Sequence, residues 1–218
     1  MTQTRRRRRT GAYAKGVAKR EEILKSALQV VAREGYRGAS VQEIADAVGL
    51  SQAGLLHYFE SKDELFTEIL RARDTMDREA FHPDPKDPRD MRYLRERYLH
   101  VFRRNAGVPG LVQLFSRLAV DAADPQHAAH GFFLHRGEVL RQGLAEIIAE
   151  AQSEGAVTDA VPAETFARVI LAVSDGVQLQ WMLDPSTDMP AVIEALFAVL
   201  APSVAPQVAD EAQAAPTS

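Results

Sequence analysis

The chain has 218 residues, which is enough for one medium domain or for a small domain joined to a larger one. A hydrophobic fraction of 46% is sufficient for a buried core, and the absence of cysteine excludes disulfides and thiolate metal sites. The lack of cysteine is also compatible with a reducing cytoplasm. No run of about 18 apolar residues occurs, so we expect no membrane-spanning segment.

The net charge of −4 conceals two oppositely charged parts. Residues 1–62 carry 12 Lys and Arg against 6 Asp and Glu, a net charge of +6, whereas residues 63–218 carry 14 against 24, a net charge of −10. A basic head on an acidic body is the pattern expected of a DNA-binding protein, although a basic segment that only aids solubility would show the same charges.

The chain begins with a basic segment that contains five consecutive arginines, Arg5, Arg6, Arg7, Arg8 and Arg9. Because like charges repel, we predict that residues 1–15 form an arm without regular structure. No apolar stretch follows the arginines, which argues against a twin-arginine export signal. Beside DNA the arm would neutralise phosphates or enter a minor groove; the alternative is a solvated tail.

Residues 16–34 have the spacing of a first helix, with apolar side chains on one face and Gly35 as its stop. The stretch 41–58 then has the spacing of a helix-turn-helix. Ala45 lies where the two helices would cross, and Gly49 lies where the turn needs a positive φ. Ser40 and Glu43 fit a capping box, and Ser51 fits the N-cap of a helix over residues 52–58.

A fourth helix is predicted from Ser61, its N-cap, with Glu64 completing a second capping box. It runs toward Phe81 and ends before the proline-rich loop 82–90. Beyond the loop we predict helices over residues 90–106, 109–123, 126–154, 162–183 and 188–201. A low-complexity tail, which we expect to be disordered, covers residues 202–218. No segment shows sustained alternation of period two, so the predicted fold is all-α with about nine helices.

Residues 19–66 resemble the DNA-binding domain of TetR-family transcriptional regulators, with the matching stretch GYRGASVQEIADAVGLSQAGLLHYFESKDELF. The resemblance implies a three-helix helix-turn-helix domain over residues 16–62 and a helical regulatory and dimerisation domain over residues 63–201. One departure is Leu56, which stands where the family usually has a phosphate-contacting tyrosine. The family also often has Lys or Arg near Gln52.

Side-chain chemistry adds roles to this resemblance. Gln52 can pair with adenine or bind a phosphate, Ala53 and Gly54 allow a close backbone approach, and His57 can donate to a phosphate. Lys62 resembles the family's phosphate-clamping lysine. His57 could instead be an ordinary surface histidine, and Tyr58 is expected to be partly buried. Besides the five arginines, the predicted DNA contacts are Ser40, Gln42, Ser51, Gln52, Ala53, Gly54, His57, Tyr58 and Lys62.

The resemblance also implies that the last two helices pair two subunits. Two heads would then read half-sites about 34–36 Å apart, or a multiple of that distance. The alternative is that these apolar stripes face the subunit's own core. The predicted interface residues are Val169, Val173, Val177, Ile193, Leu196 and Phe197.

An apolar cavity for an inducer is a further expectation, lined by Tyr98, Phe102, Leu114, Phe115, Leu118, Phe133 and Trp181. The alternative is that these side chains are plain core. His127, His130 and His135 form a cluster, but His135 is off the face that the other two share, so we expect a sheltered or surface histidine group and no metal. No cofactor is expected.

The sequence therefore predicts a homodimeric, sequence-specific transcriptional regulator. It is expected to be a repressor that a small-molecule ligand releases from a palindromic operator, acting in the bacterial cytoplasm at the nucleoid. The alternative is an architectural DNA-binding protein of low specificity that takes no ligand and whose arginine arm dominates the affinity. No catalytic motif of the GxSxG, HExxH or phosphate-loop kind is present, so we do not expect an enzyme.

Overall fold

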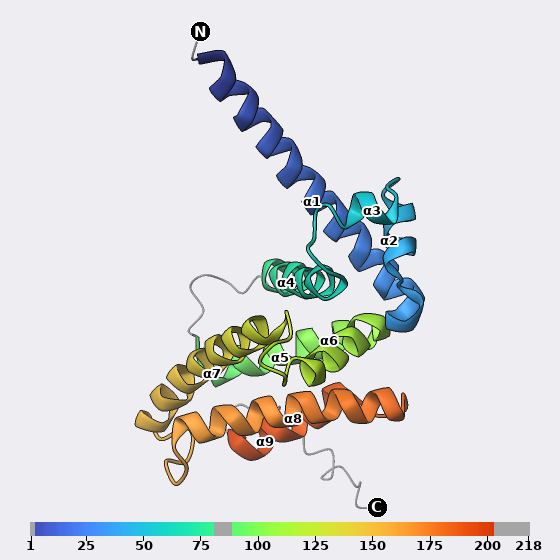
Figure 1. Cartoon of the computed structure of the whole chain (residues 1–218). Helices are drawn as coiled ribbons and strands as arrows, with labels where there is room; N and C mark the ends of the chain where they lie inside the picture. Colours follow the sequence, from blue (N-terminus) through green and yellow to red (C-terminus); the bar gives the residue numbers. More distant parts are fainter. Residues whose placement is uncertain (1–2, 81–88, 203–218) are drawn as a thin grey trace, which may run out of the picture.

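The computed structural model describes residues 3–80 and 89–202, with side chains for residues 15–35, 38–80 and 89–202. The described residues form nine α-helices and no strand, which confirms the all-α prediction. The head consists of α1 (Gln3–Gly38), α2 (Val41–Ala47), α3 (Gln52–Leu55) and α4 (Lys62–Ala80) (Figure 1). The body consists of α5 (Met91–Ala106), α6 (Pro109–Asp121), α7 (His130–Ser153), α8 (Ala163–Leu183) and α9 (Met189–Leu200), and α4 is a helix of the head that faces the body (Figure 1).

Helix α1 is longer than the sequence analysis predicted. It begins at Gln3 rather than at Gly16, so the prediction of an arm without regular structure is corrected for residues 3–15. Arginine is a good helix former, and no proline occurs before Pro83. Extending an existing helix adds one hydrogen bond for each residue that it orders, whereas starting one is costly. As a result α1 projects beyond α2 and α3, away from the body (Figure 1).

The regular part of α1 ends where predicted, at Gly35, whose φ of 73° and ψ of 170° break the helix. A left-handed φ is costly for a residue with a Cβ, which explains glycine at this kink. The backbone N–H of Ala39 donates to the carbonyl oxygen of Gly35 at 2.9 Å and leads the chain into α2. Helix α6 packs along this end of α1, with Gly110 against the kink.

Two clusters of buried side chains hold the helices together. The first joins the head to α6 and the start of α7 and includes Ile23, Val31, Ile44, Leu55, Phe66, Leu114, Leu118 and Phe132. The second joins α5, α7, α8 and α9 and includes Leu94, Phe102, Ile148, Ile170, Ile193 and Phe197. The predicted domain boundary at residues 62–63 marks a change of charge, but the first core cluster runs across it, so the head shares its core with part of the body.

The body helices begin and end within about two residues of their predicted limits, apart from the start of α7. That helix begins at His130 rather than at residue 126, because residues 122–129 form successive hydrogen-bonded turns around Pro125. Phe81 at the predicted end of the fourth helix, residues 82–88 of the predicted loop and residues 203–218 of the predicted tail lie outside the described residues. No described helix combines the length and apolarity needed to cross a membrane.

Candidate nucleic-acid interface

The start of α2 is held by the predicted capping box. The hydroxyl of Ser40 accepts the backbone N–H of Glu43 at 3.1 Å, and the carboxylate of Glu43 accepts the N–H of Ser40 at 2.7 Å. These hydrogen bonds lower the pKa of the Glu43 carboxyl, with Arg33 adding a smaller effect of the same sign. The end of α2 that carries Ser40 and Gln42 is therefore fixed while both side chains remain exposed.

The turn between α2 and α3 also follows the prediction. Gly49 has a φ of 67°, and the N–H of Leu50 donates to the carbonyl oxygen of Ala45 at 2.9 Å. Ala45 is fully buried, so α2 and α3 approach closely at that point. The hydroxyl of Ser51 accepts the N–H of Gly54 at 3.0 Å and caps α3.

Helix α3 spans four residues, fewer than the predicted 52–58. Helical hydrogen bonds continue to His57, whose N–H donates to Ala53, but the N–H of Tyr58 turns back to the carbonyl oxygen of Leu55. The helix stops here because the chain turns toward the core of the head, where the side chain of Phe59 packs with the residue only 1% exposed. The segment that would enter the groove is consequently short, and buried Leu55 and Phe59 anchor it.

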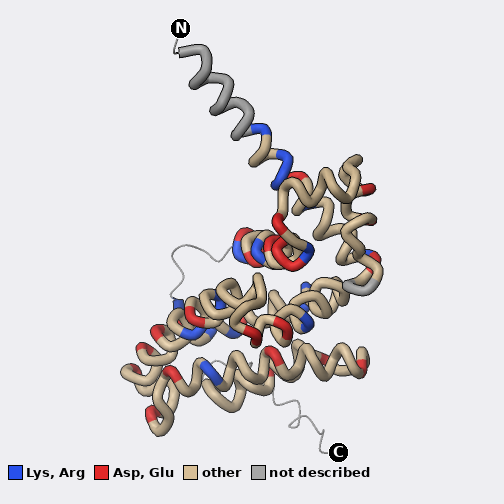
Figure 2. The backbone as a smooth tube through the Cα atoms, viewed as in Figure 1, with Lys and Arg blue, Asp and Glu red and all other residues tan. Residues whose placement is uncertain are grey.

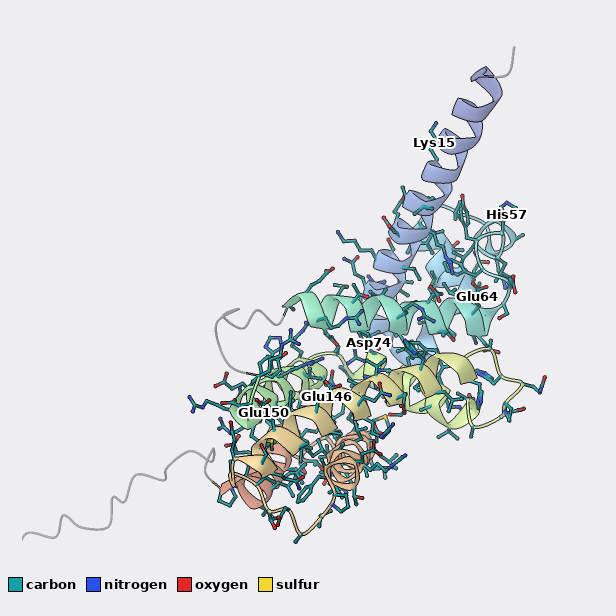
Figure 3. All side chains as sticks on the ribbon, turned by 90° about the vertical axis from the view of Figure 1, so that its left-hand side faces the viewer. Lys15, His57, Glu64, Asp74, Glu146 and Glu150 are labelled. Atoms are coloured by element: carbon teal, nitrogen blue, oxygen red, sulfur yellow. The ribbon has the colours of Figure 1, made fainter. Side chains whose placement is uncertain are left out.

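The outer surface of this segment carries the predicted contact side chains. Gln52, Ala53 and His57 are exposed, whereas Gly54 and Tyr58 are half-buried. The partial burial of Tyr58 agrees with the expectation from the sequence. Figure 3 shows His57 at the outer edge of the head, pointing away from the core. Gln42 differs from a free contact residue, because its amide donates to the carboxylate of Asp46 at 2.7 Å. One N–H of the Gln42 amide is thus engaged with Asp46, and the second remains available as a donor to a phosphate.

Positive charge at this end of the molecule comes from α1 and α4. The residues of α2 and α3 include Glu43 and Asp46 but no lysine or arginine, as Figure 2 shows. Lys15 and Lys19 lie on α1, and exposed Lys62 opens α4 with its ammonium 5.3 Å from the ring centre of Phe66. The side chains of the five predicted arginine contacts lie outside the described residues.

Arg20 is a positioning residue that the sequence analysis missed. Its guanidinium lies 3.0 Å from the carboxylate of Glu64 and 4.6 Å from the ring centre of Phe59, so it ties α1 to the start of α4. The hydroxyl of Ser61 accepts the N–H of Glu64 as predicted, but the Glu64 carboxylate accepts the N–H of Glu60, not that of Ser61. Arg20 and Glu64 are 44 residues apart, and no local pattern marks the pair.

The head also matches known proteins in sequence. Residues 23–69 match the family model described as bacterial regulatory proteins, tetR family. The head is therefore similar in sequence to the DNA-binding part of TetR-family regulators. The transcriptional regulator RutR of Escherichia coli K12 is 38% identical over 63 residues, which are 28% of this chain and 30% of RutR. The repressor KstR2 of Rhodococcus jostii is 42% identical over 53 residues, which are 24% of this chain and 26% of KstR2. The chain therefore spans less than a third of the length of these curated relatives.

Solved TetR-family structures share the whole fold at lower sequence identity. A TetR regulator from Haloarcula marismortui superposes with a TM-score of 0.67 at 23% identity, over 86% of this chain and 98% of that one. The regulator FadR of Bacillus subtilis, solved in complex with stearoyl-CoA, superposes with a TM-score of 0.66 at 18% identity, over 83% of this chain and 97% of FadR. At these identities the likeness concerns the fold, and it covers head and body together.

Leu56 is the departure from the TetR-family pattern that the sequence analysis identified. Its side chain is 36% exposed on the short turn after α3. A leucine offers no hydroxyl to a phosphate. The polar groups left on this segment are those of Gln52, His57 and Tyr58.

The predicted ligand-pocket residues of the body do not meet in one cavity. Leu114, Leu118, Phe115 and Phe133 belong to the first core cluster, whereas Tyr98, Phe102 and Trp181 belong to the second. The rings of Phe115 and Phe133 pack 5.3 Å apart, and Tyr98 stacks on Phe102 with ring centres 6.5 Å apart. The prediction of a shared lining is therefore corrected, because these side chains fill each other's space as core.

The predicted interface residues on α8 and α9 fall into two groups. Ile193 and Phe197 are fully buried within a single chain, so their assignment to a subunit interface is corrected: they have no surface left to bury. Val177 is 2% exposed and contributes only a small part of its surface to the groove along α8. Val169 is 41% exposed, and Val173 and Leu196 are half-buried. A shallow apolar groove of about 330 Å³ runs along α8 and is lined by Val169, Ala172, Val173, Gly176, Val177, Gln180 and Val192.

The histidine cluster is structural in its contacts. His127 places its Nε2 atom 3.6 Å from the carboxylate of Asp63, and its Nδ1 atom accepts the N–H of Ala129 at 3.1 Å. The Nδ1 atom of His130 lies 2.8 Å from the carbonyl oxygen of Ala122, and His135 is exposed. Across the part of the chain that the structure describes, no group of three or more His, Asp or Glu residues is placed to hold a metal ion.

Proposed function

We propose that this chain is a homodimeric, sequence-specific transcriptional repressor that leaves a palindromic operator when a small molecule binds. We place it in the bacterial cytoplasm, at the nucleoid when it is bound to DNA. The observation that carries the proposal is the head itself. Two capped helices meet at buried Ala45, and the second presents Gln52, Ala53 and His57 outward while Leu55 is fully buried.

The contact groups divide into those that read bases and those that position the protein. Gln52, at the first position of α3, offers both an amide donor and an acceptor, as adenine recognition requires. Exposed Ala53 and the small Gly54 let the backbone approach the groove. Ser40, Gln42, Ser51 and Tyr58 offer hydrogen-bond donors, and Lys62 adds positive charge at the start of α4, where the helix dipole favours an anion.

A second copy of the chain is required because one short recognition segment reads few base pairs. The apolar groove on α8 supports a partner there, since Val169 and Val192 are each more than a third exposed. The relatives support the regulatory part of the proposal: KstR2 is a transcriptional repressor, and FadR of Bacillus subtilis was solved with stearoyl-CoA. Experiments on this chain will identify its own inducer and operator.

A fluorescence-anisotropy or gel-shift assay with DNA from upstream of the gene tests the proposal. We expect one palindrome to bind a pair of chains well above random DNA at moderate salt. Equal binding to both DNAs would sink the proposal. A variant without residues 1–10 distinguishes the repressor from an architectural DNA-binding protein. The repressor would keep its sequence preference, whereas a protein whose arginine arm dominates the affinity would lose most of that affinity.

A further inference from the structure

A second hollow lies at the junction of head and body, away from the groove on α8. Its volume is about 280 Å³. Its walls come from α1, α4, α5 and the start of α6, and the lining residues are Lys25, Leu28, Gln29, Ala32, Arg73, Met76, Asp77, Arg104, Asn105, Val108 and Leu111. Figure 3 shows Asp74 on the same stretch of α4, where this helix faces the body. An occupant would therefore touch helices of both parts.

The charged groups of the lining do not cancel. Lys25, Arg73 and Arg104 carry three positive charges against the one negative charge of Asp77. Arg104 lies 2.9 Å from one oxygen of Asp77, and Arg73 lies 3.6 Å from the other. The neighbouring carboxylate of Asp74 is already paired with Arg136 at 2.8 Å.

Arg73 is the most enclosed of the three cations, with a side chain that is 11% exposed. It donates to the amide oxygen of Asn105 on α5. Burial lowers the pKa of its guanidinium, and Asp77 and Asp74 act in the opposite direction. Because an arginine remains protonated in a protein, its charge stays in the hollow and favours an anion there.

Besides the charged groups and the amides of Gln29 and Asn105, the lining is apolar. Leu28 and Ala32 contribute from α1, Met76 from α4, and Val108 and Leu111 from the start of α6. Inorganic phosphate would have to give up hydrating water to lie against these apolar side chains, which is unfavourable. A carboxylate with a short apolar group can instead pair its charge with the arginines and bury its apolar part against the apolar side chains. Arginine also offers the forked donors that match a carboxylate.

From this lining we infer that the junction hollow binds a small organic anion, a carboxylate that carries a short apolar group. Its carboxylate competes with Asp77 for Arg104, and the ion pair of Asp77 and Arg104 joins α4 to α5. Asn105 also donates to the amide oxygen of Gln178 on α8 at 3.2 Å, so the hollow is connected to the helix that carries the groove. We expect an occupied hollow to change the affinity of the protein for its operator, and this part of the inference rests on the proposed function. The binding of the carboxylate itself does not.

The experiment uses the full chain without DNA and hexanoate as the probe, followed by isothermal titration calorimetry and thermal unfolding. We expect one hexanoate to bind per chain and to raise the melting temperature, since a ligand of the folded state stabilises it. Hexanamide, which lacks the charge, and inorganic phosphate, which lacks the apolar group, are expected to bind at least about tenfold more weakly.

Variants assign the binding to the hollow. Arg104→Gln and Lys25→Gln should each raise the Kd of hexanoate about tenfold, and Ala32→Leu should abolish binding by filling the space without a change of charge. Arg103→Gln, one position from Arg104 but exposed, is the matched control and should bind as the parent does. The inference is overturned if hexanoate does not bind, if hexanamide or phosphate binds equally well, or if Arg104→Gln and Ala32→Leu leave the Kd unchanged.

The failure of this inference and that of the proposed function are separable. Operator binding measured without hexanoate tests the function, and hexanoate binding measured without DNA tests the site. If hexanoate binds and no DNA is preferred, the site stands and the repressor proposal falls. If the operator is preferred and hexanoate does not bind, the reverse holds.

Discussion

Gly110 on α6 lies against the backbone of Val31 on α1 so closely that a Cβ on Gly110 would come within 2.0 Å of the Val31 carbonyl oxygen. The same atom would come within 2.7 Å of the α-carbon of Gly35. Both obstacles are backbone atoms, which have no rotamer to move aside. The close packing of α6 of the body against α1 of the head therefore depends on a glycine at this position.

Replacing Gly110 should weaken the packing of α6 against α1. We expect Gly110→Ala to lower the free energy of unfolding by about 2–3 kcal/mol, because two backbones must separate to admit a methyl group. Chemical denaturation measures the change. Gly143→Ala is the control: a Cβ there meets nothing within 4 Å inside α7, so the variant should be more stable by about 0.5–1 kcal/mol. A loss of stability in both variants would argue against the contact as the cause.

Base reading and phosphate binding should separate in two variants of the head. Lys62→Glu should weaken binding to all DNA sequences and reduce the salt slope, because it replaces a positive charge beside the DNA phosphates with a negative one. Gln52→Ala should cost about 1–3 kcal/mol at one base-pair position and little elsewhere. Anisotropy titrations against a set of single-substituted operators distinguish the two, with Arg103→Glu on the body as a charge control. Identical sequence profiles for the two head variants would show that these roles are misassigned.

Leu56 offers a gain-of-affinity test. Leu56→Tyr places a hydroxyl where TetR-family heads usually have one, and the surface there is open. We expect operator binding to strengthen by about 0.5–1.5 kcal/mol, the usual contribution of one hydrogen bond. Leu56→Phe supplies the ring without the hydroxyl and should give no such gain. Equal gains in both would assign the effect to the ring rather than to a phosphate contact.

The groove on α8 should control self-association. Val169→Glu places a charge on the exposed apolar lining and should raise the Kd of the dimer more than about a hundredfold without unfolding the subunit. Sedimentation velocity reports the change. Val120→Glu introduces the same charge on α6, where the side chain is 73% exposed, and should leave the dimer intact. A dimer that tolerates Val169→Glu would place the interface on another face.

The capping box of α2 should make a pH-dependent contribution to stability. The pKa of Glu43 is lowered in the folded state, so its carboxylate stabilises the fold above its unfolded pKa, and this stabilisation is lost as the pH falls through the lower folded value. Glu43→Gln should therefore unfold more easily than the parent at pH 7 and about equally easily near pH 3. The difference should remain in large part in a Ser40→Ala background, because the backbone N–H of residue 40, which the Glu43 carboxylate accepts, is retained there. A pH-independent difference would contradict this origin.

Local chemistry was enough to predict most of the head. Ser40 with Glu43, Gly35 and Gly49 each lie within a few residues of the groups that they serve, so short-range hydrogen bonds and backbone sterics determine their structure. The positions of the described helices followed from apolar spacing and from proline and glycine at their ends, apart from the start of α1, the end of α3 and the start of α7. The start of α1 was missed, because like-charge repulsion between arginines was weighed above their helix propensity.

Tertiary structure alone decided which side chains of the body meet. An apolar stripe on a helix is buried by whichever neighbour reaches it, so Ile193 and Phe197 could be predicted as apolar contacts but not as core of their own subunit. The tie of Arg20 to Glu64 and the junction hollow around Arg73 join residues that are far apart in the chain. The sequence thus determined a helix-turn-helix head on a helical body. The packing of α6 against α1 through Gly110, and the excess of positive charge enclosed beside it, arise when distant helices come together.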